Sequence, residues 1–113
     1  MSFLTELTAI VSAAGLPVET GVFQGTPSDE YVVIVPLLDS LDLHADNSPG
    51  MEVSEARLSL FSKGNYNARK QQLTRLLLAD DFTITDRRYI GHEDDTGYHH
   101  LAIDVAKAYE MEE

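Results

Sequence analysis

This chain contains no cysteine, no long apolar run and, in its first half, no basic residue. Without cysteine it can form no disulfide bond, Cys-x-x-Cys redox motif, thiolate zinc site or cysteine nucleophile. No stretch approaches the roughly 20 apolar residues that a membrane-spanning helix needs. The first residues, Met-Ser-Phe-Leu-Thr-Glu, lack the basic start of a signal peptide. We therefore expect a soluble protein of the cytoplasm that makes no contact with a membrane.

The missing basic residues make the charge of the chain uneven. Eight Lys and Arg stand against 19 Asp and Glu, so the formal net charge is −11. Residues 1–56 hold nine acids and no base, a charge of −9, which leaves −2 for the other half. An acidic surface repels phosphate groups and argues against broad binding of nucleic acid or anionic membranes. Two interpretations stay open: a solvated acidic surface, or a polarity in which an acidic flank of one copy meets a mixed flank of another, head to tail.

The length and composition are those of one folded domain. The chain has 113 residues, of which 43% are hydrophobic and 24% charged. These shares lie near globular averages and argue against disorder, and a chain of this size buries enough surface for one core. We predict a single domain over residues 1–113.

Hydrophobic periodicity predicts seven elements in the order α-β-β-β-α-β-β. Residues 2–14 and 66–79 show the apolar spacing of helices, whereas the other segments alternate or are rich in β-branched residues. The expected strands are residues 18–23, 30–38, 52–62, 82–92 and 98–108. The predicted fold class is α+β, with a mainly antiparallel sheet and two packed helices.

The sequence leaves strand pairing open at three places. Pro36 cannot donate to a ladder, so its strand lies at an edge, is bulged, or ends there. Residues 39–51 are polar and contain Asp-Asn-Ser-Pro-Gly, which predicts a long hairpin tip. In the last hairpin, the apolar residues of 82–92 are even-numbered and those of 98–108 odd-numbered. They share a face only with an even loop or with a bulge at Gly91, and we expect one of the two.

Few residues suggest chemistry. His92, His99 and His100, with acids at 93–95, form the one group of metal-ligand types in the sequence. Neighbours on a strand point to opposite faces, so only one of His99 and His100 can face His92. Because zinc sites need three or four fixed ligands, we predict no metal site. The sequence also lacks a Gly-x-Ser-x-Gly elbow, a phosphate-binding glycine loop and a His-Glu-x-x-His motif. We predict no enzyme activity and no cofactor.

The most basic point of the sequence is Asp86-Arg87-Arg88. Adjacent strand arginines face opposite ways, and no aromatic platforms flank them, so they indicate nucleic-acid binding only weakly. We interpret one of these arginines as forming a salt bridge between subunits.

Three stretches together carry a family resemblance. They are residues 21–33 (Gly-Val-Phe-Gln-Gly-Thr-Pro-Ser-Asp-Glu-Tyr-Val-Val), residues 55–66 (Glu-Ala-Arg-Leu-Ser-Leu-Phe-Ser-Lys-Gly-Asn-Tyr), and Phe-Thr-Ile-Thr-Asp-Arg-Arg-Tyr-Ile-Gly at 82–91 continuing to Asp-Thr-Gly-Tyr-His-His at 95–100. The chain resembles the small tail-component proteins of prophages and siphoviruses of Gram-positive bacteria, in the group that includes tail-terminator and tail-completion proteins.

The resemblance implies a non-enzymatic structural protein that forms a ring, often a hexamer, and caps or completes the tail tube where it meets the head connector. Its partners are then further copies of itself and the tube and connector proteins, first in the host cytoplasm and later in the virion tail. DNA passes through such a ring without specific binding, and an acidic lumen lets it slide. Residues 39–51 are then an arm that reaches a neighbour or the tube. The candidate interface residues are Leu43, His44, Asp46, Asn47, Met51, Arg87 and Arg88.

Two other classes of function stay open. The 19 acidic residues suit a binding module that mimics nucleic acid and occupies a host protein, if its carboxylates are spaced like phosphates along one face. A small metal-dependent enzyme would be centred on His92 and one of His99 and His100.

Overall fold

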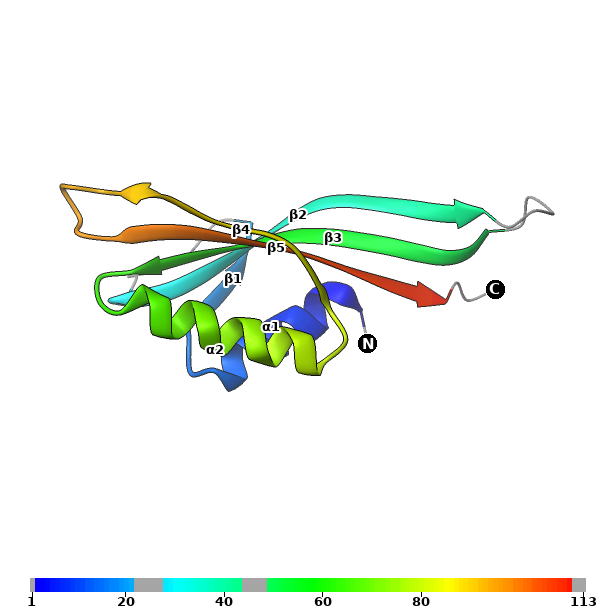
Figure 1. Cartoon of the computed structure of the whole chain (residues 1–113), viewed down its shortest axis with the longest axis horizontal. Helices are drawn as coiled ribbons and strands as arrows, with labels where there is room; N and C mark the ends of the chain where they lie inside the picture. The colour runs from blue at the N-terminus through cyan, green and yellow to red at the C-terminus, as the bar shows by residue number, and fades with distance from the viewer. Residues whose placement is uncertain (1, 22–27, 44–48, 111–113) are drawn as a thin grey trace.

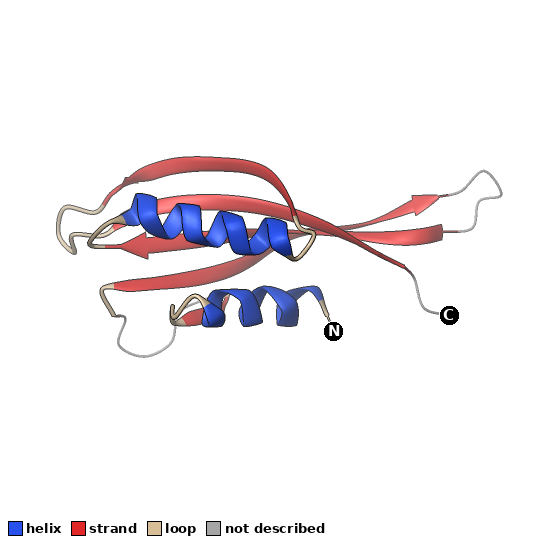
Figure 2. Ribbon diagram, turned by 60° about the horizontal axis from the view of Figure 1, so that its bottom comes forward, coloured by secondary structure: helices blue, strands red, loops and turns tan. Residues whose placement is uncertain are grey.

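Residues 2–21, 28–43 and 49–110 are described in this computed structural model. A five-stranded sheet forms one layer and two helices lie side by side on one of its faces (Figure 1, Figure 2). The fold is α+β, as predicted, and the elements follow the predicted order. Their bounds are α1 Phe3–Ala13, β1 Val18–Thr20, β2 Glu30–Leu43, β3 Pro49–Ser62, α2 Tyr66–Ala79, β4 Thr83–His92 and β5 His99–Glu110.

Both helices begin at a side-chain cap that the sequence supplies. The hydroxyl of Ser2 accepts a hydrogen bond from the amide of Thr5 at 3.2 Å, and Asn65 Oδ1 accepts one from the amide of Ala68 at 3.1 Å. Such caps satisfy amides that the first turn of a helix leaves unpaired. α2 ends at Ala79 with Asp80 as its C-cap, and the following Asp81 takes a left-handed conformation with φ of 65°.

The strand order is β1-β2-β3-β5-β4. β1 runs parallel to β2 and pairs only with Val32–Ile34, whereas the other neighbours are antiparallel along most of their length. The predicted strand at 18–23 is therefore shorter within the described residues, since β1 ends at Thr20, and residues 22–27 lie outside them. β4 forms one edge of the sheet.

The core lies between the helices and the near face of the sheet. The alternating residues of β2, β3 and β5 meet the apolar stripes of the helices there, which removes apolar surface from water. The side chains that are fully buried include Leu7, Val11, Val32, Ile34, Leu58, Leu60, Leu73, Leu77, Ile103 and Val105.

The polar stretch predicted as a hairpin tip is mostly strand, so that prediction was wrong in extent. β2 continues to Leu43 and β3 begins at Pro49, and residues 44–48 lie outside the described residues. The polar residues are held by pairing on both sides of β3: Asp39 pairs with Ser54, whose hydroxyl donates to Asp39 Oδ1 at 2.7 Å, and Val53 pairs with Ala108 of β5. Neighbouring strands therefore override the weak strand propensity of this segment.

Pro36 lies at a bulge, one of the alternatives that the sequence left open. Pro36 pairs with Ala56 and Leu38 with Glu55, so Leu37 is inserted without a partner in the ladder. The strand continues past the proline because the bulge locally interrupts the regular pairing.

The last hairpin combines an even loop with bulges. His92 pairs with His99 across a six-residue turn, Glu93–Tyr98, and the register shifts at Ile90 and again at Thr85. Each shift inserts one residue in β4, and two insertions restore the original parity, so Ile84 lies opposite Val105 and packs against the core as the parity argument expects. The shift at Ile90 removes that residue from the core face, and its side chain is 47% exposed.

Candidate functional site

The end of the sheet away from the helices forms an arm, by which we now mean residues 39–43 of β2, 49–54 of β3 and 107–110 of β5. Beyond the helices, β2, β3 and β5 run on together, and the molecule measures 54 × 25 × 23 Å along its principal axes (Figure 1). Two predicted interface residues lie on this arm by their backbone positions, where Leu43 pairs with Pro49 and Met51 pairs with Glu110. The other three predicted on the tip, His44, Asp46 and Asn47, lie outside the described residues.

The two predicted interface arginines lie on opposite faces of β4, as the sequence predicts. The Arg87 guanidinium donates to Thr74 Oγ1 of α2 at 3.4 Å, a long bond on the helix side. On the other face, Arg88 forms a salt bridge with Asp86 within the same strand, at 2.6 Å. Neither arginine reaches the arm of its own chain, because Arg87 lies level with Ile34, several pairs before the arm begins.

Two long stretches of sheet edge have no described strand beside them: all of β4, and β2 from Val35 to Leu43. Other such stretches are shorter, including the outer side of β1 and the end of β5 beyond Ala106. We call the two long stretches the β4 edge and the distal β2 edge. Four of the five large apolar side chains that are exposed among the described residues lie there, two at the bulge of each edge. They are Leu37 (49% exposed), Leu38 (52%), Tyr89 (49%) and Ile90 (47%). The sequence did not predict that these pairs are exposed, although Pro36 and Gly91 lie next to the bulged residues Leu37 and Ile90.

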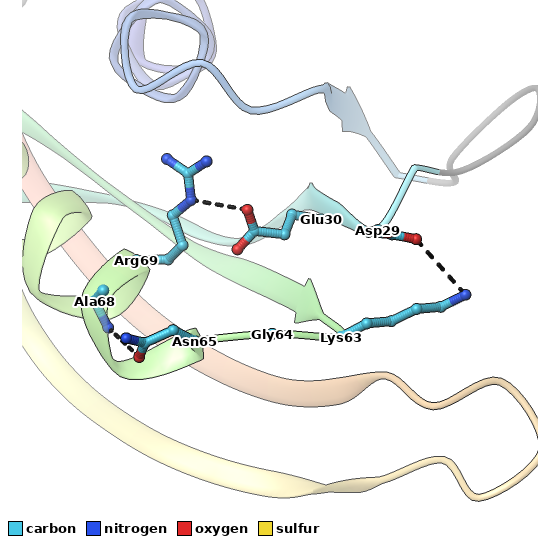
Figure 3. Close-up of a pocket in the computed structure, with 7 residues that line it drawn as sticks. All are labelled: Asp29, Glu30, Lys63, Gly64, Asn65, Ala68 and Arg69. Atoms are coloured by element: carbon cyan, nitrogen blue, oxygen red, sulfur yellow. Dashed lines mark hydrogen bonds and ion pairs between the residues drawn. The ribbon is translucent and has the colours of Figure 1, made fainter.

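A pocket of about 320 Å³ lies where the N-terminus of α2 meets the ends of β2 and β3 (Figure 3). Its central ion pair joins Arg69 Nε to Glu30 Oε1 at 3.0 Å. Ser62 donates to the second oxygen of Glu30 at 3.1 Å, and Arg69 also donates to the carbonyl of Ala14 at 3.0 Å. These bonds pair the half-buried charges of Glu30 and Arg69 with each other and connect α2 to β2, β3 and the end of α1.

The histidines divide between the two faces of β5. His99 faces His92, with ring centroids 4.7 Å apart, which confirms that only one of the adjacent pair does so. His99 Nδ1 lies 2.9 Å from the hydroxyl of Tyr89, and His92 Nδ1 lies 3.0 Å from Asp94 Oδ1. Within the described residues, no group of three or more histidines and carboxylates is placed to hold a metal ion.

An aromatic row crosses the face of the sheet that carries no helix. Tyr31 stacks on Phe61 with centroids 4.8 Å apart, Phe61 stacks on His100 at 4.3 Å, and Tyr98 meets Tyr31 edge-on at 5.3 Å. Burial lowers the pKa of His100 below its usual value; nearby Glu93 opposes this effect. The row therefore holds His100 as a neutral ring at pH 7.

A second polar cluster ties the base of the arm to α1. Lys107 Nζ lies 3.2 Å from Glu6 and donates to the carbonyl of Asp80 at 2.9 Å, and the Tyr109 hydroxyl donates to Glu6. Burial raises the pKa of Glu6, but the hydrogen bonds from Tyr109 and Lys107 outweigh it, so the net pKa lies below its usual value. Burial and the Glu6 carboxylate raise the pKa of Tyr109. The cluster thus keeps Glu6 charged and Tyr109 protonated.

Comparison of the chain with models of known protein families gives no match, and comparison with curated proteins gives none either. Neither of the two helices, which both lie within the described residues, is long and apolar enough to cross a membrane.

Proposed function

We propose that this chain is a non-enzymatic structural subunit of a phage tail, which forms a ring and caps or completes the tail tube at the head-tail junction. The proposal starts from the sequence resemblance carried by residues 21–33, 55–66, 82–91 and 95–100. The single structural observation that supports it best is the arm, in which three strands continue past both helices (Figure 1). An arm of this kind suits a subunit that reaches beyond its own core to a neighbour or to the tube.

The charges of the described residues do not favour the nucleic-acid mimic. Five of the 19 acids form ion pairs with Lys or Arg within the described residues, which removes them from any unpaired row of carboxylates. The pairs are Glu6–Lys107, Asp29–Lys63, Glu30–Arg69, Asp86–Arg88 and Asp104–Arg57.

Two measurements test the proposal. The purified chain is expected to form rings, visible by multi-angle light scattering and negative-stain microscopy, either alone or when mixed with tail tubes. A phage that lacks the gene is expected to make tails of wrong length or tails that fail to join heads. Normal infectious particles from the deletion would refute the tail role, and a chain that stays monomeric alone and with tubes would refute the ring.

A further inference from the structure

The two open edges of the sheet fit each other in direction, length, charge and apolar content. We propose that the β4 edge of one copy of this chain pairs with the distal β2 edge of the next copy, so that the sheet continues from subunit to subunit. This inference rests on the ring assembly proposed above and deepens it, because it names the surface through which the copies join.

The strand directions allow this pairing without turning a copy over. Neighbours alternate in direction across β2, β3, β5 and β4, so β4 runs opposite to β2. A second copy set beside the first in the same orientation therefore presents its β4 antiparallel to β2, which continues the alternation. The ten residues of β4 are also close in number to the nine of the distal β2 edge, Val35–Leu43, which lies beyond the three residues that β1 covers.

The composition of the edges favours a partner over water. Natural sheet edges are usually protected by charges, and large apolar side chains are rare on them. Here each edge exposes an apolar pair at its bulge, Leu37 and Leu38 on one and Tyr89 and Ile90 on the other. The charges are complementary, since β4 carries two arginines and one acid whereas the distal β2 edge carries two acids and no base. A second copy of this chain supplies both an apolar pair and the opposite charge.

The register between the two edges is limited by one condition, namely that the helices of all copies lie on the same face of the continuous sheet. A shift by an odd number of residue pairs would turn the side chains of the neighbour to the other face, so the shift is even. Within its own chain Arg87 lies level with Ile34, through Ile103 and Leu58. Asp39 lies four pairs further along β2. A shift of four pairs toward the arm therefore places Arg87 opposite Asp39.

Both members of this pair face the helix side. Arg87 contacts Thr74 of α2, and Asp39 pairs with Ser54, two residues from the core residue Ala56 on the same face of β3. Opposite charges directly across an antiparallel pair stabilise it by roughly 0.2–1 kcal/mol. The pair therefore contributes mainly to the choice of register and direction.

The same register brings the apolar pairs together. Tyr89 lies level with Val32 in its own chain, so a shift of four pairs places it opposite Pro36. The bulged residues Ile90 and Leu37 then lie on the two sides of the Tyr89–Pro36 pair. A shift of six pairs would instead place Tyr89 opposite Asp39. The aromatic side chain would then face a carboxylate, and Arg87 would no longer lie opposite Asp39.

The shift also provides the stagger that a closed ring of strands requires. Four pairs correspond to about 13 Å along the strand, and the four long strands of one copy span about 19 Å across the sheet. The ratio gives a strand tilt of about 35°, at the lower end of the roughly 35–45° typical of closed barrels. Repetition of one contact can therefore close on itself, as a head-to-tail assembly needs.

A disulfide cross-link tests the contact, because the chain has no cysteine of its own. Arg87→Cys and Asp39→Cys are made as separate variants. Both positions are exposed, and circular dichroism checks that each variant folds. The two variants are mixed at high concentration, oxidised with diamide and run on a non-reducing gel. We expect a covalent dimer from the mixture and none from either variant alone, since cross-strand partners lie within disulfide reach. Arg88→Cys is the matched control, because it lies on the same strand but on the other face, and its mixture with Asp39→Cys is expected to stay unlinked.

Each other outcome overturns the proposed contact in a different way. Linking by single variants alone would indicate a two-fold contact, and equal linking by the Arg88→Cys control would refute the register. Rings in light scattering without any cross-link would refute this interface and leave the ring assembly standing. Monomers without cross-link, alone and with tail tubes, would refute both.

Discussion

His100 combines a favourable ring contact with an unfavourable burial. Its ring stacks on Phe61, yet its Nε2 atom is the one buried side-chain nitrogen or oxygen without a hydrogen-bond partner among the residues that the structure describes. A buried polar atom left unpaired costs about 1–3 kcal/mol. The side chain therefore behaves as an aromatic ring that carries a polar atom the fold does not use.

We expect His100→Phe to stabilise the chain by roughly 1 kcal/mol at pH 7, because it keeps the stack and removes the unpaired nitrogen. In the wild type, burial holds the pKa of His100 below its unfolded value near 6.5, so the unfolded state takes up a proton first. Stability is thus fully present above pH 6.5 and decreases as the pH falls below it. Urea unfolding between pH 5 and 8 measures the free energy of unfolding. We expect it to decrease less for the variant than for the wild type as the pH falls from 8 to 5. An unchanged pH profile would contradict the role given to burial.

We expect Tyr109→Phe to destabilise the chain by about 1 kcal/mol at pH 7, since Glu6 loses one of its hydrogen bonds. The pKa of Glu6 is lowered in the folded state, so its contribution to stability is present above its unfolded pKa and decreases as the pH falls through the folded value. The difference between wild type and variant is therefore expected to narrow below about pH 4. Thermal unfolding at pH 3.5 and 7 checks this, and a difference that does not depend on pH would count against it.

Helix α2 depends on a single cap for its first turn. The Asn65 side chain accepts from Ala68, and the turn before it carries Lys63 and Gly64 of the polar pocket (Figure 3). We expect Asn65→Ala to cost about 1 kcal/mol of unfolding free energy in urea titrations. Asn65→Asp is the control, because it keeps the acceptor at the N-terminus of the helix and is expected to stay close to wild type.

The two helices were predicted closely, whereas the arm was not. Residues 2–14 and 66–79 became Phe3–Ala13 and Tyr66–Ala79, because apolar spacing and caps are signals within one segment of sequence. The strand character of residues 39–43 depends instead on pairing with β3, and that of residues 49–51 on pairing with β2 and, at Met51, with β5. Local propensity does not contain this pairing. Pairing thus decided the structure of the one segment to which most of the candidate interface residues belong.

At the sheet edges, too, local sequence did not predict the exposure of single residues. Ile90 was expected in the core from its even number, and the bulge at that residue exposes it. Pro36 did predict irregular pairing, but nothing in the sequence indicated that Leu37 and Leu38 next to it would be exposed. The proposed tail role comes from the sequence resemblance, and the arm and the sheet edges are features suited to assembly.

For the molecule as a whole, net charge opposes self-association. Each copy carries −11, whereas the proposed contact contains one close ion pair, worth roughly 0.2–1 kcal/mol when exposed. Repulsion between whole molecules therefore outweighs local attraction at low ionic strength. Salt screens that repulsion, since the Debye length decreases from about 30 Å at 0.01 M to about 8 Å at 0.15 M.

We expect the oligomeric fraction of the purified chain to increase as NaCl is raised from 0.01 to about 0.15 M. Light scattering at fixed protein concentration measures it. Arg87→Gln serves as the control, because it removes the ion pair but leaves the net acidity, and its oligomers are expected to show the same upward trend at a lower level. A fraction that decreases with salt would mean that attraction between opposite charges dominates assembly.

The short strand β1 limits where a neighbouring copy can pair with β2. Its three residues take the pairing positions of Val32–Ile34. In the register proposed above, Gly91 of an incoming β4 lies opposite Val35, and the position opposite Ile34 that His92 would take next is already held by Thr20 of β1. β1 therefore serves as an end stop that limits how far a neighbour can slide along β2. The length of β1 would then set the offset between neighbouring copies. A longer β1 would shift every copy along its neighbour by the same distance.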